Sequence, residues 1–340
     1  MDKTRVGIIN VTGYAGVELA RLLMCHPQVE LVSVTGRSAA GKKLVEVFPH
    51  LAGSNLTIED KLGEVELALV AMPHKESASE VLPLLDKGIK VVDLSADFRL
   101  KDGQEYTAWY GIDHPAPQLL PQAVYGLTEL YRQQVAQAQL VANPGCYPTG
   151  AILSLAPAVK HGLIEADIIV DSKSGVSGAG RSLNIKTHYA EANEDTAAYA
   201  LEGHRHLPEI VQELALLQAG EKPRVTFVPH LVPMTRGILT TDYARLNGQV
   251  TAGEVMAAYC RFYENEPFVK VMDHPPHTKH TYGNNMCFIY PTIDARSGRL
   301  VVVSCIDNLV KGAAGQAIQN MNLMLGLAEA TGLESPAVYP

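Results

Sequence analysis

Near its N-terminus the chain runs Asn10-Val11-Thr12-Gly13-Tyr14-Ala15-Gly16, between an apolar run at 5–10 and a helical pattern at 17–25. The same alternation continues with apolar runs at 30–35, 65–71 and 89–94 and a helical pattern at 76–87. Apolar runs separated by helical patterns are typical of parallel strands joined by helices. The sequence therefore predicts an α/β protein that opens with a doubly wound parallel sheet.

The turn at 10–16 resembles the glycine-rich turn of Rossmann-like folds. Gly13 would let a pyrophosphate approach the backbone, and the following helix would present its N-terminus to that anion. Asn10 stands at the first glycine position, and asparagine is the next most tolerant residue for a positive φ. We expect a dinucleotide site that includes Thr12, Gly13, Tyr14, Ala15 and Gly16.

The end of the second expected strand indicates which dinucleotide binds. Arg37 and Ser38 follow this strand, where folds that prefer NAD usually carry an acidic residue. A guanidinium and a hydroxyl suit a 2′-phosphate. We therefore predict NADP as the cofactor.

The second half of the chain has a different pattern. Its expected strands predict a mostly antiparallel sheet, at 168–171, 224–228, 237–246, 286–290 and 300–306. We also expect helices at 255–263 and 308–327, and loops at 100–122 and 173–181. The fold class is thus α/β, with a second α+β domain.

The composition of the chain excludes some classes of binding partner. The 340 residues carry a net charge of −8, which argues against nucleic acid or an anionic membrane as a partner. We find no signal-peptide pattern and no apolar stretch that could span a bilayer. Five scattered cysteines without a CxxC pair indicate reduced thiols in a cytoplasm. We expect a small-molecule substrate.

Cys146 differs in its setting from the other cysteines. It lies within Asn143-Pro144-Gly145-Cys146-Tyr147-Pro148, at the expected start of a helix. Free backbone N–H groups and the helix dipole would favour its thiolate, so we predict a nucleophile. The others lie in apolar runs and are expected in the core: Cys25, Cys260, Cys287 and Cys305.

A nucleophilic thiol needs an acid–base partner. Candidates lie in Gly203-His204-Arg205-His206-Leu207-Pro208-Glu209, where one histidine would serve and Glu209 would support it. Surface histidines or a zinc site with Cys146 are alternatives, although helical zinc pairs more often have i, i+4 spacing. We predict no metal.

Two further segments have anion-binding features. The run Ser174-Gly175-Val176-Ser177-Gly178-Ala179-Gly180-Arg181 would offer backbone N–H groups and a guanidinium to an anion; a flexible hairpin is the alternative. Arg99 follows a strand of the first domain, at the end that faces the ligand crevice in doubly wound folds. It is a candidate substrate anchor.

Six runs together resemble the type 1 N-acetyl-gamma-glutamyl-phosphate reductase family of arginine biosynthesis, at 12–16, 93–99, 143–149, 174–181, 203–209 and 307–316. The resemblance implies that Cys146 attacks the acyl phosphate of N-acetylglutamyl phosphate. Phosphate is then expelled, and a thioester remains on Cys146. NADPH reduces this thioester, and N-acetylglutamate 5-semialdehyde is released. His204 is the implied acid–base partner, with His206 and Glu209 in support.

The resemblance also extends the site and the domain plan. Asn308 is expected near the nicotinamide, with Ser177 and Gly178 in the cofactor site. The expected substrate-binding residues are Arg99, Asn143, Ser174 and Arg181. As in semialdehyde dehydrogenase-like folds, the final helix would pack on the first domain. The NADP-binding domain would then be 1–145 with 308–340, and the catalytic, substrate and oligomerisation domain 146–307, in a homodimer or homotetramer.

Other functions would use part of the same pattern. Aspartate-semialdehyde dehydrogenase is a relative within the fold class. The aminoadipyl-phosphate reductase of lysine synthesis would favour a basic docking face, which an acidic chain disfavours. A cysteine hydrolase or acyltransferase would not need the turn at 10–16, and a nucleotide-binding regulator would not need a reactive Cys146.

Overall fold

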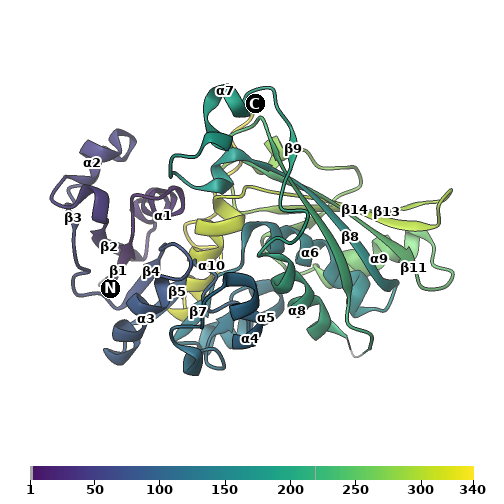
Figure 1. Ribbon diagram of the computed structural model, residues 1–340, viewed down its shortest axis with the longest axis horizontal. Helices are drawn as coiled ribbons and strands as arrows, with labels where there is room; N and C mark the ends of the chain where they lie inside the picture. Colours follow the sequence, from purple (N-terminus) through teal and green to yellow (C-terminus); the bar gives the residue numbers. More distant parts are fainter. Residues whose placement is uncertain (1–2, 219) are drawn as a thin grey trace. The chain divides into compact units, whose positions relative to one another are not determined.

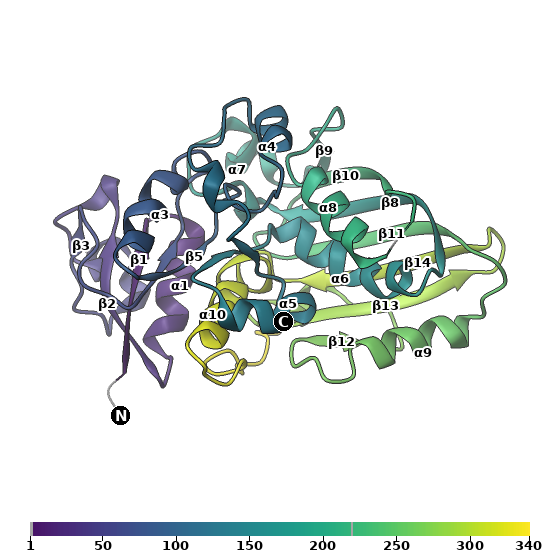
Figure 2. The same cartoon turned by 90° about the horizontal axis from the view of Figure 1, so that it is seen from below.

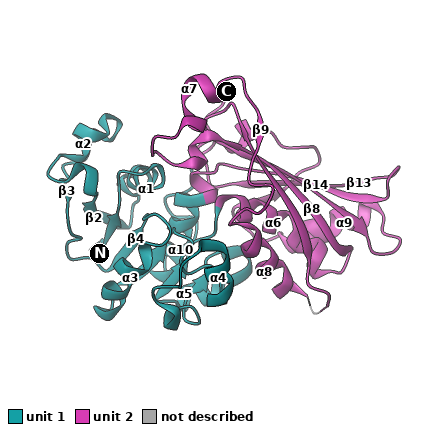
Figure 3. Ribbon diagram, in the orientation of Figure 1, with its two compact units in different colours: residues 1–145, 313–335 teal, residues 146–312, 336–340 magenta. Residues whose placement is uncertain are grey.

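The computed structural model describes residues 3–218 and 220–340. The chain divides into two compact units, which Figure 3 colours separately. Unit 1 is Met1–Gly145 with Ala313–Ser335, and unit 2 is Cys146–Gly312 with Pro336–Pro340. The functional division that we predict differs from these two units at 308–312 and 336–340, which belong to unit 2.

Unit 1 is built on a sheet with the strand order β3-β2-β1-β4-β5-β7-β6 (Figure 1). Its strands are β1 (Thr4–Ile9), β2 (Val29–Thr35), β3 (Ile58–Glu59), β4 (Leu67–Val70), β5 (Lys90–Asp93), β6 (Val124–Tyr125) and β7 (Leu140–Ala142). Neighbouring strands in this order pair in parallel, which confirms the predicted parallel sheet. The order reverses at β1, and doubly wound folds bind ligands beside the carboxyl ends of the strands at such a point.

Helices cover both faces of this sheet. Helix α3 (Ser77–Asp86) packs on one face, where its Val81 joins Val91 of β5 in a buried cluster. Helix α10 (Gly315–Met324) reaches β5 from the end of the chain, and Lys90 Nζ donates to Met324 O. Since Lys90 and Val91 point to opposite faces of β5, the two helices lie on opposite faces. The other helices are α1 (Tyr14–Met24), α2 (Leu44–Val47), α4 (Gly103–Tyr110) and α5 (Thr128–Gln137).

The loop predicted at 100–122 is wrong, because α4 lies within it. Asp102 caps this helix by accepting a hydrogen bond from Gln104 N at 2.8 Å. Gly111, with φ 69°, ends it in the left-handed conformation. Both caps are visible in the sequence, but the many prolines and glycines around them favoured a loop.

Unit 2 is built on a mixed sheet with the order β12-β13-β14-β11-β8-β10-β9. Its strands are β8 (Ile164–Gly175), β9 (Ala197–Ala198), β10 (Arg224–Val232), β11 (Ile238–Leu246), β12 (Val269–Val271), β13 (Cys287–Asp294) and β14 (Arg299–Ile306). The pairs β12–β13 and β8–β10 are parallel, and the remaining neighbours are antiparallel. The predicted α+β domain with a mostly antiparallel sheet is confirmed.

Helix α6 (Cys146–Lys160) is the central helix of unit 2. Its residues 147–159 are all buried, as expected for a helix that is apolar on every side. It contacts β11 and β14 of the sheet, and also α8 (Leu207–Leu217) and α9 (Ala252–Phe262) (Figure 2). Unit 2 also contains the short helix α7 (Tyr189–Ala192).

Two other local predictions differ from the structure. The expected loop at 173–181 begins inside β8, and a 3-10 turn, η4 (Val176–Ala179), follows the strand. Pairing with β10 and β11 overrides the glycine- and serine-rich composition there. The helix expected at 308–327 is a π-helical turn, η7 (Val310–Ala314), followed by α10.

The cysteines expected in the core fall into two groups. Cys287 and Cys305 are buried, which confirms the prediction for both. Cys25 and Cys260 are exposed, so the prediction is wrong for them. Cys25 lies just beyond the end of α1, and Cys260 lies on the outer side of α9. An apolar neighbourhood in sequence did not place either on a buried helix face.

Candidate active site

The turn at 10–16 ends β1 at the point where the strand order reverses. Asn10 has φ 67°, the positive value that we predicted it could tolerate. Its Nδ2 donates to Ala71 O at 2.8 Å, just beyond β4, and its Oδ1 accepts from Thr12 Oγ1 at 3.2 Å. Asn10 therefore ties the carboxyl ends of β1 and β4 together, which a glycine could not do.

Gly16 brings α1 against the end of β1. A Cβ atom at Gly16 would lie 2.3 Å from Asn10 O and 2.8 Å from Val11 Cα, so a larger residue would push the helix away. At Gly13, the nearest atom to an added Cβ would be Asn10 Nδ2 at 3.7 Å. The predicted residues Tyr14 and Ala15 form the first turn of α1. The residue just before α1 is thus Gly13, which leaves the N-terminus of the helix open on that side.

A cleft of about 740 Å³ lies in unit 1 beside this turn. Its lining includes Thr12, Arg37 and Ser38, which are three of the predicted nucleotide-binding residues. Apolar side chains such as Leu62 and Met72 also line it. The cleft thus combines apolar surface with charged groups, as ligand sites commonly do.

Arg99 and Asn143 lie next to each other in the interior of unit 1. Arg99 Nε donates to Asn143 O and Arg99 Nη2 to Leu94 O, both at 2.8 Å. The Asn143 side chain donates to Ala313 O at 3.1 Å and accepts from Asn320 Nδ2 at 3.0 Å. These bonds brace the segment that leads to α6. A role for Arg99 and Asn143 in substrate binding stays a prediction.

Cys146 is the first residue of α6 and is partly buried. This is the helix start at which we expected it, where the helix dipole favours an anion. A Cβ atom at Gly312 would lie 2.9 Å from Cys146 Cβ. The η7 turn therefore packs directly against the residue that carries the thiol, and only glycine fits there without movement.

Aromatic rings surround His204 within unit 2. The centroid of its ring lies 5.3 Å from that of Phe227, 5.6 Å from that of Tyr199 and 5.7 Å from that of Tyr147. Burial among these rings, and then the charge of Arg205, lower the pKa of His204 to about 4. The imidazole is therefore neutral near pH 7.

The backbone of His206 determines which nitrogen of His204 carries the hydrogen. His206 N donates to His204 Nδ1 at 3.1 Å, so the neutral ring carries its hydrogen on Nε2. The two imidazole rings lie 4.8 Å apart. Glu209 is buried in the first turn of α8, directly after His206. The structure thus gathers His204, His206 and Glu209 at the start of one helix.

Tyr147 and Tyr199 connect Cys146 with this histidine cluster. Tyr147 follows Cys146 in α6, and its hydroxyl accepts from Tyr199 OH at 3.1 Å and donates to His230 O at 3.2 Å. Burial raises the pKa of Tyr199 to about 12 and that of Tyr147 further, so both phenols stay neutral. Sequence reasoning missed both tyrosines because neither belongs to a motif with a chemical signature.

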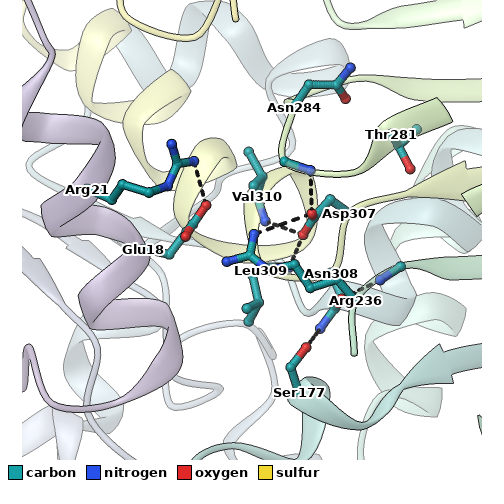
Figure 4. Close-up of polar contacts among 12 residues, drawn as sticks. Glu18, Arg21, Ser177, Arg236, Thr281, Asn284, Asp307, Asn308, Leu309 and Val310 are labelled. Atoms are coloured by element: carbon teal, nitrogen blue, oxygen red, sulfur yellow. Dashed lines mark hydrogen bonds and ion pairs between the residues drawn. The ribbon is translucent and has the colours of Figure 1, made fainter. Parts of the chain in front are cut away.

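A second cluster in unit 2 surrounds Asn308 (Figure 4). Asn308 Nδ2 donates to Ser177 Oγ at 2.9 Å, and Asn308 Oδ1 accepts from Gly237 N at 2.8 Å. A Cβ atom at Gly178 would lie 3.1 Å from Ser174 Oγ. The structure therefore brings together four predicted residues that are distant in sequence: Ser174, Ser177, Gly178 and Asn308.

Asp307 organises the start of the final helical segment, and sequence reasoning missed it. Its Oδ1 accepts from Leu309 N at 2.8 Å and Val310 N at 3.1 Å (Figure 4). Its Oδ2 accepts from Gly283 N at 2.7 Å and lies 3.4 Å from Arg236 Nη1. An aspartate just before an expected helix is a common N-cap, and this signal could have identified it.

The last of the predicted residues, Arg181, is exposed beyond η4. Within residues 3–218 and 220–340, no group of three or more His, Cys, Asp or Glu side chains could hold a metal ion.

The helices of that same part of the chain are all too short or too polar to span a membrane.

Two family models match the chain. Residues 5–138 match the semialdehyde dehydrogenase NAD binding domain, and residues 146–308 match the semialdehyde dehydrogenase dimerisation domain. N-acetyl-gamma-glutamyl-phosphate reductase of Dehalococcoides mccartyi is 62% identical over 100% of both chains. The chain belongs to the N-acetyl-gamma-glutamyl-phosphate reductase family. Another member of this reductase family, from Pelotomaculum thermopropionicum, is 52% identical over 99% of each chain.

Solved structures with a similar fold are also semialdehyde dehydrogenases. Aspartate semialdehyde dehydrogenase with NADP from Candida albicans has a TM-score of 0.71 at 14% identity, covering 95% of this chain and 99% of its own. Aspartate semialdehyde dehydrogenase II complexed with ASA, from Vibrio cholerae, has a TM-score of 0.71 at 16% identity, covering 96% and 99%. The predicted fold class is confirmed, as is the resemblance to the reductase family.

Proposed function

We propose that this chain is an NADPH-dependent oxidoreductase of arginine biosynthesis. It reduces N-acetyl-L-glutamyl 5-phosphate to N-acetyl-L-glutamate 5-semialdehyde and phosphate. The observation that carries this proposal is Cys146 at the start of α6, in a chain that matches the reductase family over its full length. An acyl phosphate is an activated electrophile, and a thiolate is a good nucleophile near neutral pH.

Cys146 is the proposed nucleophile. The N-terminus of the 15-residue helix α6 favours the thiolate over the thiol. Attack of Sγ on the acyl carbon forms a carbon–sulfur bond and expels phosphate, which leaves a thioester on Cys146. A thioester accepts a hydride more readily than a carboxylate would, so this step prepares the reduction.

His204 is the proposed acid–base partner. In the tautomer that the His206 amide supports, Nε2–H can donate to the thiolate or to an oxyanion at the acyl carbon. Because its pKa is about 4, a protonated ring gives up its proton readily. His206 and Glu209 are proposed to support this ring, His206 through the hydrogen bond from its backbone N–H and Glu209 from the adjoining turn of α8.

NADP is the proposed cofactor, and the residues of unit 1 fit it. Gly16 lets α1 begin close to the end of β1, and Gly13 has no side chain that would block a diphosphate at the N-terminus of α1. The residues proposed to hold it are Thr12, Gly13, Tyr14, Ala15 and Gly16. Arg37 and Ser38 in the adjoining cleft would hold the 2′-phosphate. The bound nicotinamide supplies the hydride.

A further group of residues is proposed to hold the nicotinamide and the substrate. Asn308, Ser177 and Gly178 form one hydrogen-bonded cluster and would fix the nicotinamide. Ser174 borders that cluster and is proposed to bind substrate. The other proposed substrate-binding residues are Arg99, Asn143 and Arg181.

A homodimer or homotetramer is the proposed assembly. Residues 146–308 match a dimerisation domain. The unit 2 sheet packs against α6 with one face, and its other face points away from this helix. On that face Tyr243 of β11 pairs with Ile169 of β8 and Val301 of β14. Each of these side chains is partly exposed in one chain, so a second copy could bury them together.

A cytoplasmic location is also proposed. The thiol of Cys146 must stay reduced to act as a nucleophile, which an oxidising compartment would not ensure. The net charge of −8 supports a small-molecule substrate, without nucleic acid or a membrane as partner.

The direct test runs the reaction in reverse. Purified protein is given N-acetylglutamate 5-semialdehyde, phosphate and NADP⁺, and NADPH is followed by its absorbance. We expect turnover that requires phosphate and that is at least 100-fold slower with aspartate semialdehyde. A pocket that hydrogen-bonds a polar group of its substrate rejects an analogue without that group, because the polar groups of the pocket are then left unpaired. Equal rates with both aldehydes would contradict the proposed substrate.

A further inference from the structure

Arg37 is already paired with carboxylates inside its own cleft. Its Nη1 lies 2.6 Å from Glu76 Oε2, and its Nη2 lies 3.9 Å from Glu80 Oε1. Arg37 follows β2, whereas Glu76 and Glu80 lie between β4 and the middle of α3. Because β1 lies between β2 and β4, the ion pair bridges the carboxyl end of β1.

The backbone around Glu76 is held in place by Asp97. Oδ1 of Asp97 accepts from Lys75 N at 2.7 Å, and Oδ2 accepts from Ser77 N and Ala78 N, both at 3.1 Å. Asp97 itself is fully buried. The residues on both sides of Glu76 are therefore fixed, and its carboxylate stays within reach of Arg37.

Acidic and basic groups balance in the lining of the cleft. The cations are Arg37, Lys61 and Lys87, and the anions are Asp60, Glu76 and Glu80. A site that selects a dianionic 2′-phosphate strongly would carry an excess of cations. Here two of the three carboxylates face the guanidinium that is proposed to bind this phosphate.

We propose that Glu76, assisted by Glu80, sets the cofactor specificity of this chain by holding Arg37 and opposing a 2′-phosphate. This inference rests on the proposed function, because it places the adenosine half of the cofactor in this cleft. A 2′-phosphate must displace Glu76 from Arg37 and then lie near two carboxylates. A 2′-hydroxyl avoids that repulsion and can donate to Glu76. The cleft should therefore distinguish NADPH from NADH less than Arg37 alone would allow.

Binding of nucleotide fragments isolates this effect from catalysis. Adenosine 2′,5′-bisphosphate and 5′-AMP differ in the 2′-phosphate, and calorimetry gives the affinity of each for the whole protein. We expect Glu76→Gln to tighten the bisphosphate about fivefold and to leave 5′-AMP unchanged or slightly weaker, as for one exposed charge. Glu80→Gln should have a smaller effect of the same sign, because its contact is longer.

Two further variants complete the experiment. Arg37→Ala should weaken the bisphosphate about tenfold and leave 5′-AMP alone, since it removes the phosphate partner. Glu30→Gln changes an exposed carboxylate outside the cleft lining and should leave the ratio of the two affinities at the wild-type value. Thermal unfolding of each variant shows that the fold is kept.

The outcomes separate this inference from the proposed function. If the wild-type protein binds NADPH and the bisphosphate, but Glu76→Gln leaves the ratio of the two affinities unchanged, specificity does not depend on Glu76 and the inference is overturned alone. If the wild-type protein binds neither NADPH nor the bisphosphate, the cofactor assignment fails, and the inference fails with it.

Discussion

His204 shows how its surroundings change what an imidazole can do. Burial and Arg205 lower its pKa to about 4, below the ordinary value near 6.5. The ring is therefore protonated only as the pH falls through about 4, and a proton on Nδ1 would then break the bond from His206 N.

We expect the pH profile of kcat/KM to reflect this low pKa. Between pH 5 and 7 His204 stays neutral, so its protonation should cause no step near pH 6.5 in the wild-type enzyme. His204→Asn should lower the rate about 100- to 10,000-fold across this range, as for the loss of a general acid–base group. A step near pH 6.5 that disappears in His204→Asn would show that the ring titrates as if it were exposed.

At Cys146 the expected effect is loss of chemistry without loss of cofactor binding. Serine is a far weaker nucleophile than a thiolate near neutral pH, so Cys146→Ser should reduce phosphate-dependent turnover by more than about 1,000-fold. NADPH affinity, measured by fluorescence titration, should stay within about twofold. Cys260→Ser is the matched control, because this cysteine is exposed on α9 and should keep full activity. Turnover within tenfold of wild type in Cys146→Ser would exclude the thioester route.

At the scale of elements, the junction of β1 and α1 depends on one close approach. An added methyl at Gly16 would meet Asn10 O at 2.3 Å, so Gly16→Ala must shift the helix. We expect a loss of about 1–3 kcal/mol in the free energy of unfolding, as for overpacking a rigid contact, measured by urea denaturation. Gly13→Ala, with its nearest contact at 3.7 Å, should cost less. Equal losses in the free energy of unfolding for the two variants would show that the close contact at Gly16 is not the cause of the destabilisation.

The elements also show which parts of the fold the sequence could predict. Strands β1, β2, β4 and β5 of unit 1 are predictable because each contains an apolar run, as at 65–71. The two-residue strands β3 and β6 are too short to leave such a pattern. Helix α4 was missed although Asp102 and Gly111 mark both of its ends. The last residues of β8 could not be predicted, since Ser174 is buried only by pairing with distant strands.

Only part of the candidate site could be predicted from the sequence. Cys146 and His204 belong to motifs whose residue types suggest chemistry. Tyr147 and Tyr199 contact each other although they are far apart in sequence, and such a contact leaves no local pattern. The low pKa of His204 likewise depends on rings that come from separate segments.

At the scale of the whole molecule, the free face of the unit 2 sheet should determine assembly. Ile169→Asp places a charge among Tyr243 and Val301, where burial against a second copy would be costly. We expect this variant to sediment as a monomer when the wild-type protein sediments as a dimer or tetramer. Leu216→Asp, on exposed α8 surface, is the control and should keep the wild-type mass. An unchanged mass for Ile169→Asp would place the interface elsewhere.

Asp97 has a consequence for how a long ligand can lie along unit 1. Its carboxylate already occupies the N-terminus of α3 through the amides of Ser77 and Ala78, whereas the N-cap residue of α1 is Gly13, which has no side chain to cap that helix. A diphosphate that slid sideways by one helix would meet a negative charge instead of free N–H groups. We therefore expect this carboxylate to set the register of a bound dinucleotide along the sheet edge, independently of the contacts that its base and its nicotinamide make.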